Sequence, residues 1–282
     1  MDEIPDLRAT RAIEVFPGEA IDAYRPAAIA ARIESAGVAK VRLGLLQTMT
    51  LAVLAGAFIA FGSMLYTLVM TDSSLGLGPG RLLGGIAFAL GLILVVIAGA
   101  ELFTGNNLIV MAWADRRISG FDLLRSWAIV YSGNLIGAVA TALFVFWSGT
   151  LGVGDGAVSR TALSIAQAKV SLPYDQAFIR GILCNALVCL AVWLSYAARD
   201  VAGKILAIVF PIAAFVALGF EHSVANMYFI PLGMILGAEI TISQLLMNLV
   251  PVTVGNLIGG SVLVGLVYWI AYRPPRSRSS PC

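Results

Sequence analysis

The sequence predicts an all-α integral membrane protein in which six transmembrane helices form an inverted 3+3 repeat, with helices two and five broken. Three observations predict this fold. First, 59% of the 282 residues are hydrophobic and 12% are charged, whereas soluble domains carry about a quarter charged residues. Second, long segments of the chain hold no charged residue. Third, two motifs from the first half of the chain recur in the second half.

The two ends of the chain differ from its middle. Residues 1–41 are charged and lack the apolar core of a cleavable signal peptide. We expect them to form a cytoplasmic N-terminal tail with a short amphipathic helix near 20–40. Residues 42–272 form the predicted transmembrane domain, with repeats at about 42–150 and 176–272. Residues 273–282 form a second tail, also predicted to be cytoplasmic.

Uncharged segments mark the membrane spans, since a spanning helix needs roughly 20 apolar residues. The segments without charge are 43–70, 82–100, 126–154, 181–198, 205–220 and 240–272. The second and fifth spans, near 82–113 and 205–237, are long, and each is interrupted by an acid. Lysine and arginine are concentrated at one side of the predicted membrane, with fourteen on the side of both tails and four on the other. This asymmetry places both termini in the cytoplasm.

Two motif pairs indicate an internal repeat. The segment GAELFTGNN at 99–107 aligns with GFEHSVANM at 219–227, and GNLIGAVATALFVFW at 133–147 aligns with GNLIGGSVLVGLVYW at 255–269. A unit of three spans is odd, so the second copy crosses the membrane in the opposite sense. Transporters and channels with such repeats place their sites where two broken helices meet near the midplane.

Each predicted break offers polar groups to the freed backbone, through Asn106 in the first and Asn226 in the second. The half-helix that restarts after each break directs its positive end toward the middle of the membrane. Two such ends from opposite sides predict a site that favours anions.

His222, the only histidine of the chain, lies at the second break. It follows Phe215 by seven residues and Gly219 by three, so we expect all three on one helix face. Phe88 and Leu92 lie on a similar face in the first half, and the two faces predict a narrow pore. Ionisable groups at membrane depth are usually functional, although an interhelical hydrogen bond is the alternative. We expect His222 to be neutral at rest and to give a proton, or a strong hydrogen bond, to the anion of a weak acid.

The remaining polar residues have less specific roles. Glu101 and Glu221 are predicted to be structural and to accept hydrogen bonds from freed backbone N–H groups. Thr104 could bond His222 or the substrate, or simply cap its loop. Lys169 could attract anions to the pore, or be an ordinary surface lysine. Asn185 could line the pore or bond another helix.

The repeated GNLIG motif is expected to serve packing. Its glycines permit close helix approach, and Asn134 and Asn256 are expected to satisfy backbone groups at the breaks. One histidine and two half-buried acids supply no set of metal ligands, so no metal or cofactor is expected. The chain also shows no basic stripe for nucleic acid.

Several motifs together resemble the formate/nitrite transporter family. They are GAELFTGNNLIV, YSGNLIGA, GILCNALVCLAVWLSYAARD, GFEHSVANMYFIPLGM and PVTVGNLIGGSVLVGLVYW. The resemblance, which covers about 30–272, implies an aquaporin-like fold and a homopentamer with one pore in each subunit. It implies small monovalent anions as substrates: formate, nitrite, hydrosulfide and, in some members, acetate or lactate.

Carried onto this sequence, the resemblance makes His222 the central histidine of the pore and Thr104 the threonine of a mobile loop. Lys169 lies in a stretch similar to that of the family's vestibule lysine. The apolar constrictions would be formed by Phe88, Leu92, Leu102, Phe103 and Phe215.

We therefore expect transport of formate across the bacterial inner membrane, with proton transfer at His222. Nitrite or hydrosulfide transport is the alternative within the family. A water or glycerol channel is disfavoured because both breaks lack Asn-Pro-Ala, and an ammonium conductor because it would pair two histidines. An intramembrane enzyme would need a nucleophile, a metal cluster or an acid pair, so the chain is not expected to be an enzyme.

Overall fold

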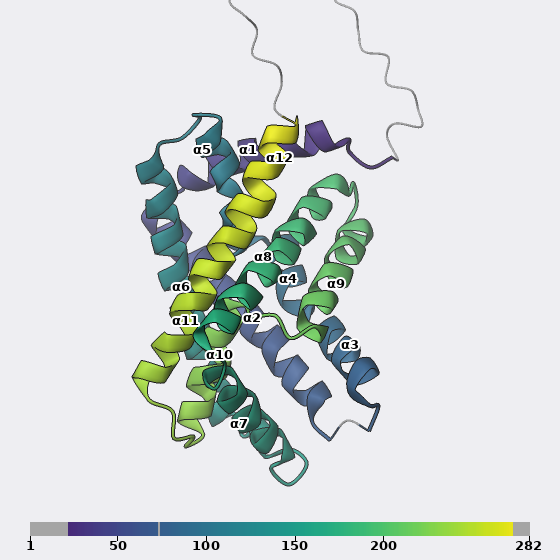
Figure 1. Cartoon of the computed structure of the whole chain (residues 1–282), viewed down its shortest axis with the longest axis vertical. Coiled ribbons are helices and arrows are strands. Elements are labelled where there is room, and N and C mark those ends of the chain that lie inside the picture. Colours follow the sequence, from purple (N-terminus) through teal and green to yellow (C-terminus); the bar gives the residue numbers. More distant parts are fainter. Residues whose placement is uncertain (1–21, 73, 273–282) are drawn as a thin grey trace, which may run out of the picture.

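The computed structural model describes residues 22–72 and 74–272, and all the regular elements in these two ranges are helices (Figure 1). The predicted tail through residue 21 and the tail at 273–282 lie outside the described residues. The first three spans and their connections comprise α1 Pro26–Val41, α2 Leu45–Met70, α3 Leu77–Phe88, α4 Leu90–Leu94, the π-helical η2 Val95–Gly99, the 3-10 helix η3 Gly105–Ile109, α5 Val110–Ala114, α6 Gly120–Trp147 and the short η4 Thr150–Gly152. The rest comprises α7 Ala157–Val170, α8 Tyr174–Ala197, α9 Val201–Ala217, α10 Ser223–Ile235, α11 Ile242–Leu257, the π-helical η5 Ile258–Leu266 and α12 Val267–Tyr272.

The six predicted spans are present. Within the described ranges, 5 helical segments are long and apolar enough to cross a membrane: 45–70, 77–99, 120–147, 174–197 and 242–272. The remaining span consists of the two shorter apolar helices α9 and α10. The second span breaks after Gly99 and the fifth after Ala217, and both breaks contain a glycine in the left-handed region, with φ +82 at Gly99 and +72 at Gly219. That conformation strains any residue with a Cβ.

The first and third spans of each half pack closely. A Cβ added to Gly137 on α6 would collide with the backbone of Val53 on α2. A Cβ added to Gly259 on η5 would collide with the backbone of Ile182 on α8 in the same way. The glycines of the repeated motif thus let the backbones approach each other, as small residues do between membrane helices.

Two helices, α1 and α7, lie at opposite ends of the bundle (Figure 1). At one end, α1 begins at Pro26, somewhat later than predicted, and buries Ile29 and Ile33 against the segment after the first break. At the other end, α7 occupies a stretch that the sequence was expected to leave as a connection. It packs on α10, where Gly233 leaves space for Ala166.

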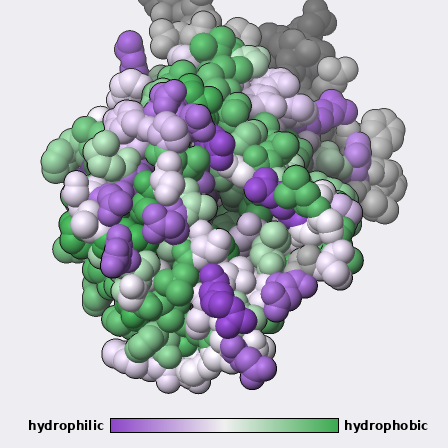
Figure 2. Space-filling view, turned by 60° about the horizontal axis from the view of Figure 1, so that its bottom comes forward, coloured by the Kyte–Doolittle hydropathy of each residue, from purple (hydrophilic) through white to green (hydrophobic). Residues whose placement is uncertain are grey.

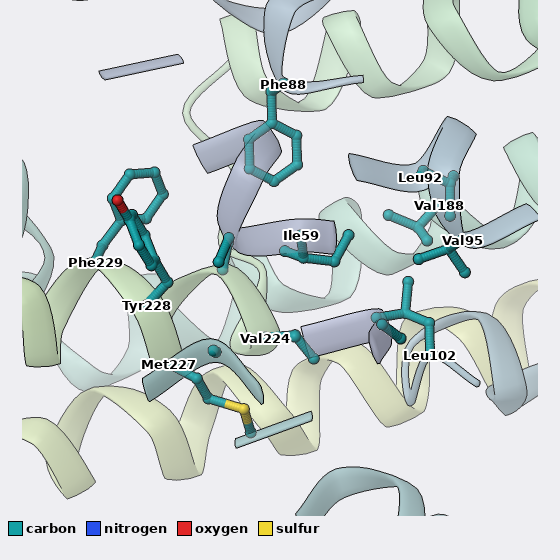
Figure 3. Close-up of a cluster of buried hydrophobic side chains, with 14 of the residues drawn as sticks. Ile59, Phe88, Leu92, Val95, Leu102, Val188, Val224, Met227, Tyr228 and Phe229 are labelled. Atoms are coloured by element: carbon teal, nitrogen blue, oxygen red, sulfur yellow. The ribbon is translucent and has the colours of Figure 1, made fainter. Parts of the chain in front are cut away.

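The centre of the bundle is apolar. Ile59, Leu92, Leu102, Val188 and Val224 come from five different segments and meet in one buried cluster (Figure 3). This packing holds the two breaks against each other and so positions the polar residues that they carry.

Candidate functional site

Two cavities enter the molecule from opposite ends. Cavity 1, about 400 Å³, lies beside α1 and is lined by residues that include Arg32, Lys40, Leu92, Leu102 and Glu101. Cavity 2, about 310 Å³, lies beside α7 and is lined by residues that include Phe88, Lys169, Phe215, Glu221 and His222. Viewed toward the α7 end, the surface shows a hollow with hydrophilic residues around it (Figure 2).

Apolar side chains close the inner end of each cavity. Leu92 and Leu102, both 2% exposed, line cavity 1, and Val95 lies between them in the view of Figure 3. In cavity 2, the rings of Phe88 and Phe215 meet edge to face, with centroids 5.6 Å apart. Phe103, the other predicted constriction residue, belongs to the same buried apolar cluster as these four. Its ring packs against Tyr131 of α6, at 4.9 Å between centroids, and it lines neither cavity.

His222 is the N-cap residue of α10. Its Nδ1 accepts a hydrogen bond from the backbone N–H of Ala225 at 3.1 Å. A neutral ring whose Nδ1 accepts must carry its proton on Nε2, and Nε2 lies 2.9 Å from Oγ1 of Thr104. The two breaks therefore meet through a hydrogen bond between these side chains.

The expectation that Phe215, Gly219 and His222 share one helix face was wrong, because α9 ends at Ala217 and Gly219 turns the chain. The aromatic ring and the imidazole are nevertheless neighbours, stacked with centroids 6.0 Å apart. The ring of Phe88 lies 6.5 Å from the imidazole.

Two side chains of α8 hydrogen-bond to the loop that carries Thr104. The carbonyl of Thr104 accepts from Nδ2 of Asn185 at 3.2 Å and from Sγ of Cys189 at 3.3 Å. Asn185 also donates to the carbonyl of Asn256 on α11 at 2.7 Å, so one side chain bonds both the first break and the sixth span. Asn185 lines neither cavity, so of its two expected roles the structure favours the interhelical bond.

Each acid at a break forms an ion pair. Glu101 accepts from Nζ of Lys40 at 2.8 Å and from Nδ2 of Asn106 at 2.6 Å. Glu221 accepts from Nζ of Lys169 at 3.1 and 3.2 Å, and from Nδ2 of Asn226 at 2.7 Å.

These partners correct two expectations. The carboxylates were expected to accept from backbone N–H groups, but their donors are lysine and asparagine side chains. Lys169 was expected either to attract anions freely or to be solvated. Instead it is paired with Glu221, and its side chain is 15% exposed. Lys40 was missed, since its role depends on how α1 docks rather than on a local pattern.

The asparagines of the repeated motif satisfy the broken backbone. Oδ1 of Asn134 accepts from the N–H of Phe103, and Oδ1 of Asn256 accepts from the N–H of Ser223, both at 2.9 Å. Their amides donate to the carbonyls of Glu101 at 2.9 Å and of Glu221 at 3.0 Å. In each break an asparagine thus bonds both an N–H and a carbonyl of the non-helical backbone, at a depth where lipid cannot do so.

No grouping of three or more histidine, cysteine or acidic residues that could hold a metal occurs among the described residues. The two buried cysteines, Cys184 and Cys189, are free thiols. The arrangement suits a small polar solute, because one cavity reaches His222 and the other reaches the loop that carries its partner Thr104.

Comparisons with known proteins agree with this architecture. The family profile described as formate/nitrite transporter matches residues 27–270. Formate channel FocA of Escherichia coli K12 is 41% identical over 271 residues, 89% of this chain and 95% of FocA. The probable formate transporter of Methanothermobacter thermautotrophicus is 46% identical over 244 residues, 80% of this chain and 89% of that protein.

Two solved structures are similar as well. One, described as a pentameric formate channel with formate bound, is 38% identical with a TM-score of 0.75, covering 81% of this chain and 97% of that one. The other, an FNT family ion channel, is 32% identical with a TM-score of 0.80, covering 86% and 98%. The chain is thus a multi-pass membrane transport protein and not an enzyme. It belongs to the formate/nitrite transporter family.

Proposed function

We propose that this chain carries small monovalent anions of weak acids, formate first among them, through a pore in each subunit of a homopentamer. The observation that carries the proposal is the hydrogen-bonded pair of His222, which lines cavity 2, and Thr104, which lies in the loop between Leu102 and Gly105 of cavity 1. We place the protein in the bacterial inner membrane with both termini in the cytoplasm, so that cavity 2 faces outward. The formate channels among its relatives support this substrate.

The charges of both cavities suit an anion. Cavity 1 is lined by Arg32, Lys40 and Lys204 with one acid, Glu101, and cavity 2 also has more basic than acidic residues. Between the cavities, the leucine and phenylalanine walls offer no replacement for a hydration shell. A small ion with a hydrogen-bond partner is therefore favoured over a large or strongly hydrated one.

Nε2 of His222 supplies that partner. In this conformation it carries the ring proton and can donate to an anion that displaces Oγ1 of Thr104. Transfer of a proton to the anion requires an imidazolium, in which Nδ1 also carries a proton and cannot accept from Ala225. We therefore infer that the anion is first bound by hydrogen bonding. Proton exchange then occurs in a conformation in which the Ala225 bond is open.

Uptake of radiolabelled formate into proteoliposomes tests the function. We expect saturable uptake above that of empty liposomes, stimulated by an inward proton gradient, with nitrite and hydrosulfide as competitors that rank the substrates. Native mass measurement of the same preparation reports the subunit number. Uptake equal to empty liposomes for all three anions would refute the proposal. Formate current that moves no protons at acidic pH would remove the proton step alone.

A further inference from the structure

Two arginines at cavity 2 converge on the break of the fifth span. Arg81 comes from α3 and Arg180 from α8, and both line the cavity. The NH1 nitrogen of Arg81 donates to the carbonyl of Ala217, and that of Arg180 to the carbonyl of Gly219, both at 3.4 Å. The two nitrogens lie 3.5 and 4.0 Å from the point that a Cβ of Gly219 would occupy.

These contacts counter an electrostatic obstacle. The α9 helix ends at Ala217, and the last carbonyls of a helix carry the negative end of its dipole. Val216, Gly219 and Glu221 of this segment line cavity 2. An anion in the cavity would therefore lie near those carbonyls. The guanidinium groups that bond the carbonyl of Ala217, and that of Gly219 just beyond the helix, reduce this repulsion.

The arginines also leave net positive charge in the cavity. The ion pairs within 22–72 and 74–272 join Lys40 to Glu101, Arg117 to Glu34 and Lys169 to Glu221. Neither Arg81 nor Arg180 takes part in any of them. The acid of cavity 2, Glu221, is already paired with Lys169, so the charges of both arginines are available to a solute.

The internal repeat shows that one of these arginines is not needed to build a break. The N–H of Glu221 donates to the carbonyl of Arg180 at 3.3 Å, and the N–H of Glu101 donates to the carbonyl of Leu51 at 3.2 Å. Arg180 and Leu51 therefore hold equivalent places, and each lines the cavity of its own half. A leucine suffices for the backbone contact, so the guanidinium has another use.

We propose that Arg81 and Arg180 form an anion-capture site at cavity 2, which a substrate occupies before it reaches His222. This inference rests on the proposed function. The ligand class is a small planar anion with two oxygens, such as a carboxylate, because a guanidinium group pairs with two oxygens at once. The site raises the rate at which anions enter from the α7 end and does not act on the opposite end.

The test uses full-length protein in right-side-out and in inverted membrane vesicles, at subsaturating radiolabelled formate. Arg180→Leu places in cavity 2 the residue type that Leu51 supplies at the equivalent place in cavity 1. Arg81→Gln removes the second charge. At low ionic strength each variant should lower uptake about two- to threefold and the double variant about fivefold, in one vesicle orientation only. High salt should close the gap to wild type, since screening removes the attraction. A merely structural role would not produce this salt dependence.

Two further variants serve as controls. Arg180→Lys keeps the charge but loses the two-oxygen pairing, so its uptake should lie between that of Arg180→Leu and that of wild type. Lys204→Gln removes a charge from cavity 1, so any loss should appear in the other vesicle orientation. Wild-type uptake by the double variant in both orientations, or an equal loss at all salt concentrations, would overturn the capture site while leaving formate transport in place. Failure of the wild type to carry formate, nitrite or acetate would refute the proposed function and the capture site together.

Discussion

The two breaks share a framework and differ in what they present at the centre. Each has a left-handed glycine, Gly99 or Gly219, and an acid paired with a lysine. Each also has an asparagine from the third span of its half that bonds the freed backbone. Both halves therefore solve the problem of non-helical backbone in a membrane in the same way.

The differences lie at the residues that meet in the middle. His222 occupies in the second break the place that Leu102 occupies in the first, directly after the acid. The second break restarts as the regular helix α10, whereas the first restarts as the 3-10 helix η3. The expected pair of equivalent positive helix ends is thus unequal. The comparison teaches that the repeated residues build the frame, while residues that occur once supply the chemistry.

The largest effect on stability should come from unpairing the acids. Lys169→Met leaves Glu221 buried without its partner and should lower the free energy of unfolding by about 3 kcal/mol. Lys40→Met should cost less, because Lys40 is 28% exposed and Lys169 is 15% exposed. Denaturation in detergent measures both. Adding Glu221→Gln to the Lys169→Met variant should restore most of the lost stability. If Lys169→Met and Lys40→Met lost the same stability and Glu221→Gln restored none of it, the ion pairs would not be the cause.

The asparagines test whether the two halves are equivalent. Asn134→Leu and Asn256→Leu each leave a buried N–H and two carbonyls without their partner. Each variant should lower the free energy of unfolding by about 2 kcal/mol, and the two losses should be similar. Ser132→Ala, at an exposed serine of α6, is the control. If one asparagine proved dispensable, the framework would not be shared.

Thr104→Val tests the contact that joins the breaks. The change preserves shape but removes the oxygen 2.9 Å from Nε2 of His222, so stability should fall by about 1 kcal/mol. Formate uptake should fall severalfold because the loop no longer aligns the imidazole. Thr141→Val, which removes a bond within α6, should leave uptake unchanged. Equal rates in both variants would separate Thr104 from transport.

The smallest effect is expected at Glu34 on α1, outside the spans. Burial and then the carboxylate of Asp115 raise the pKa of Glu34 above its ordinary 4.5, and Arg117 opposes them in part. The folded state thus holds this proton more tightly, so stability should fall as the pH rises from about 4.5 through the raised pKa. Glu34→Gln should remove this slope and raise the melting temperature at neutral pH by less than about 2 °C. A steeper slope in the variant would contradict the assignment.

Features encoded in local patterns could be predicted from the sequence. Uncharged runs gave the spans, the repeated motifs located both breaks and the backbone role of Asn134 and Asn256, and the lone histidine drew attention to His222. Features that depend on docking could not. Lys40 reaches Glu101 only because α1 folds over the bundle, and the contact of Phe103 with Tyr131 depends on how the first break packs against α6.

Formate uptake by the His222→Leu variant tests most directly the claim that His222 takes part in transport. The substitution gives the second break the residue type that Leu102 supplies at the same place in the first break. The protein should still assemble with the oligomeric mass of wild type. Proton-stimulated formate uptake in proteoliposomes should fall at least about tenfold, because the variant lacks the ionisable imidazole that exchanges a proton with the anion. Wild-type uptake by the assembled variant would show that the imidazole has no part in transport.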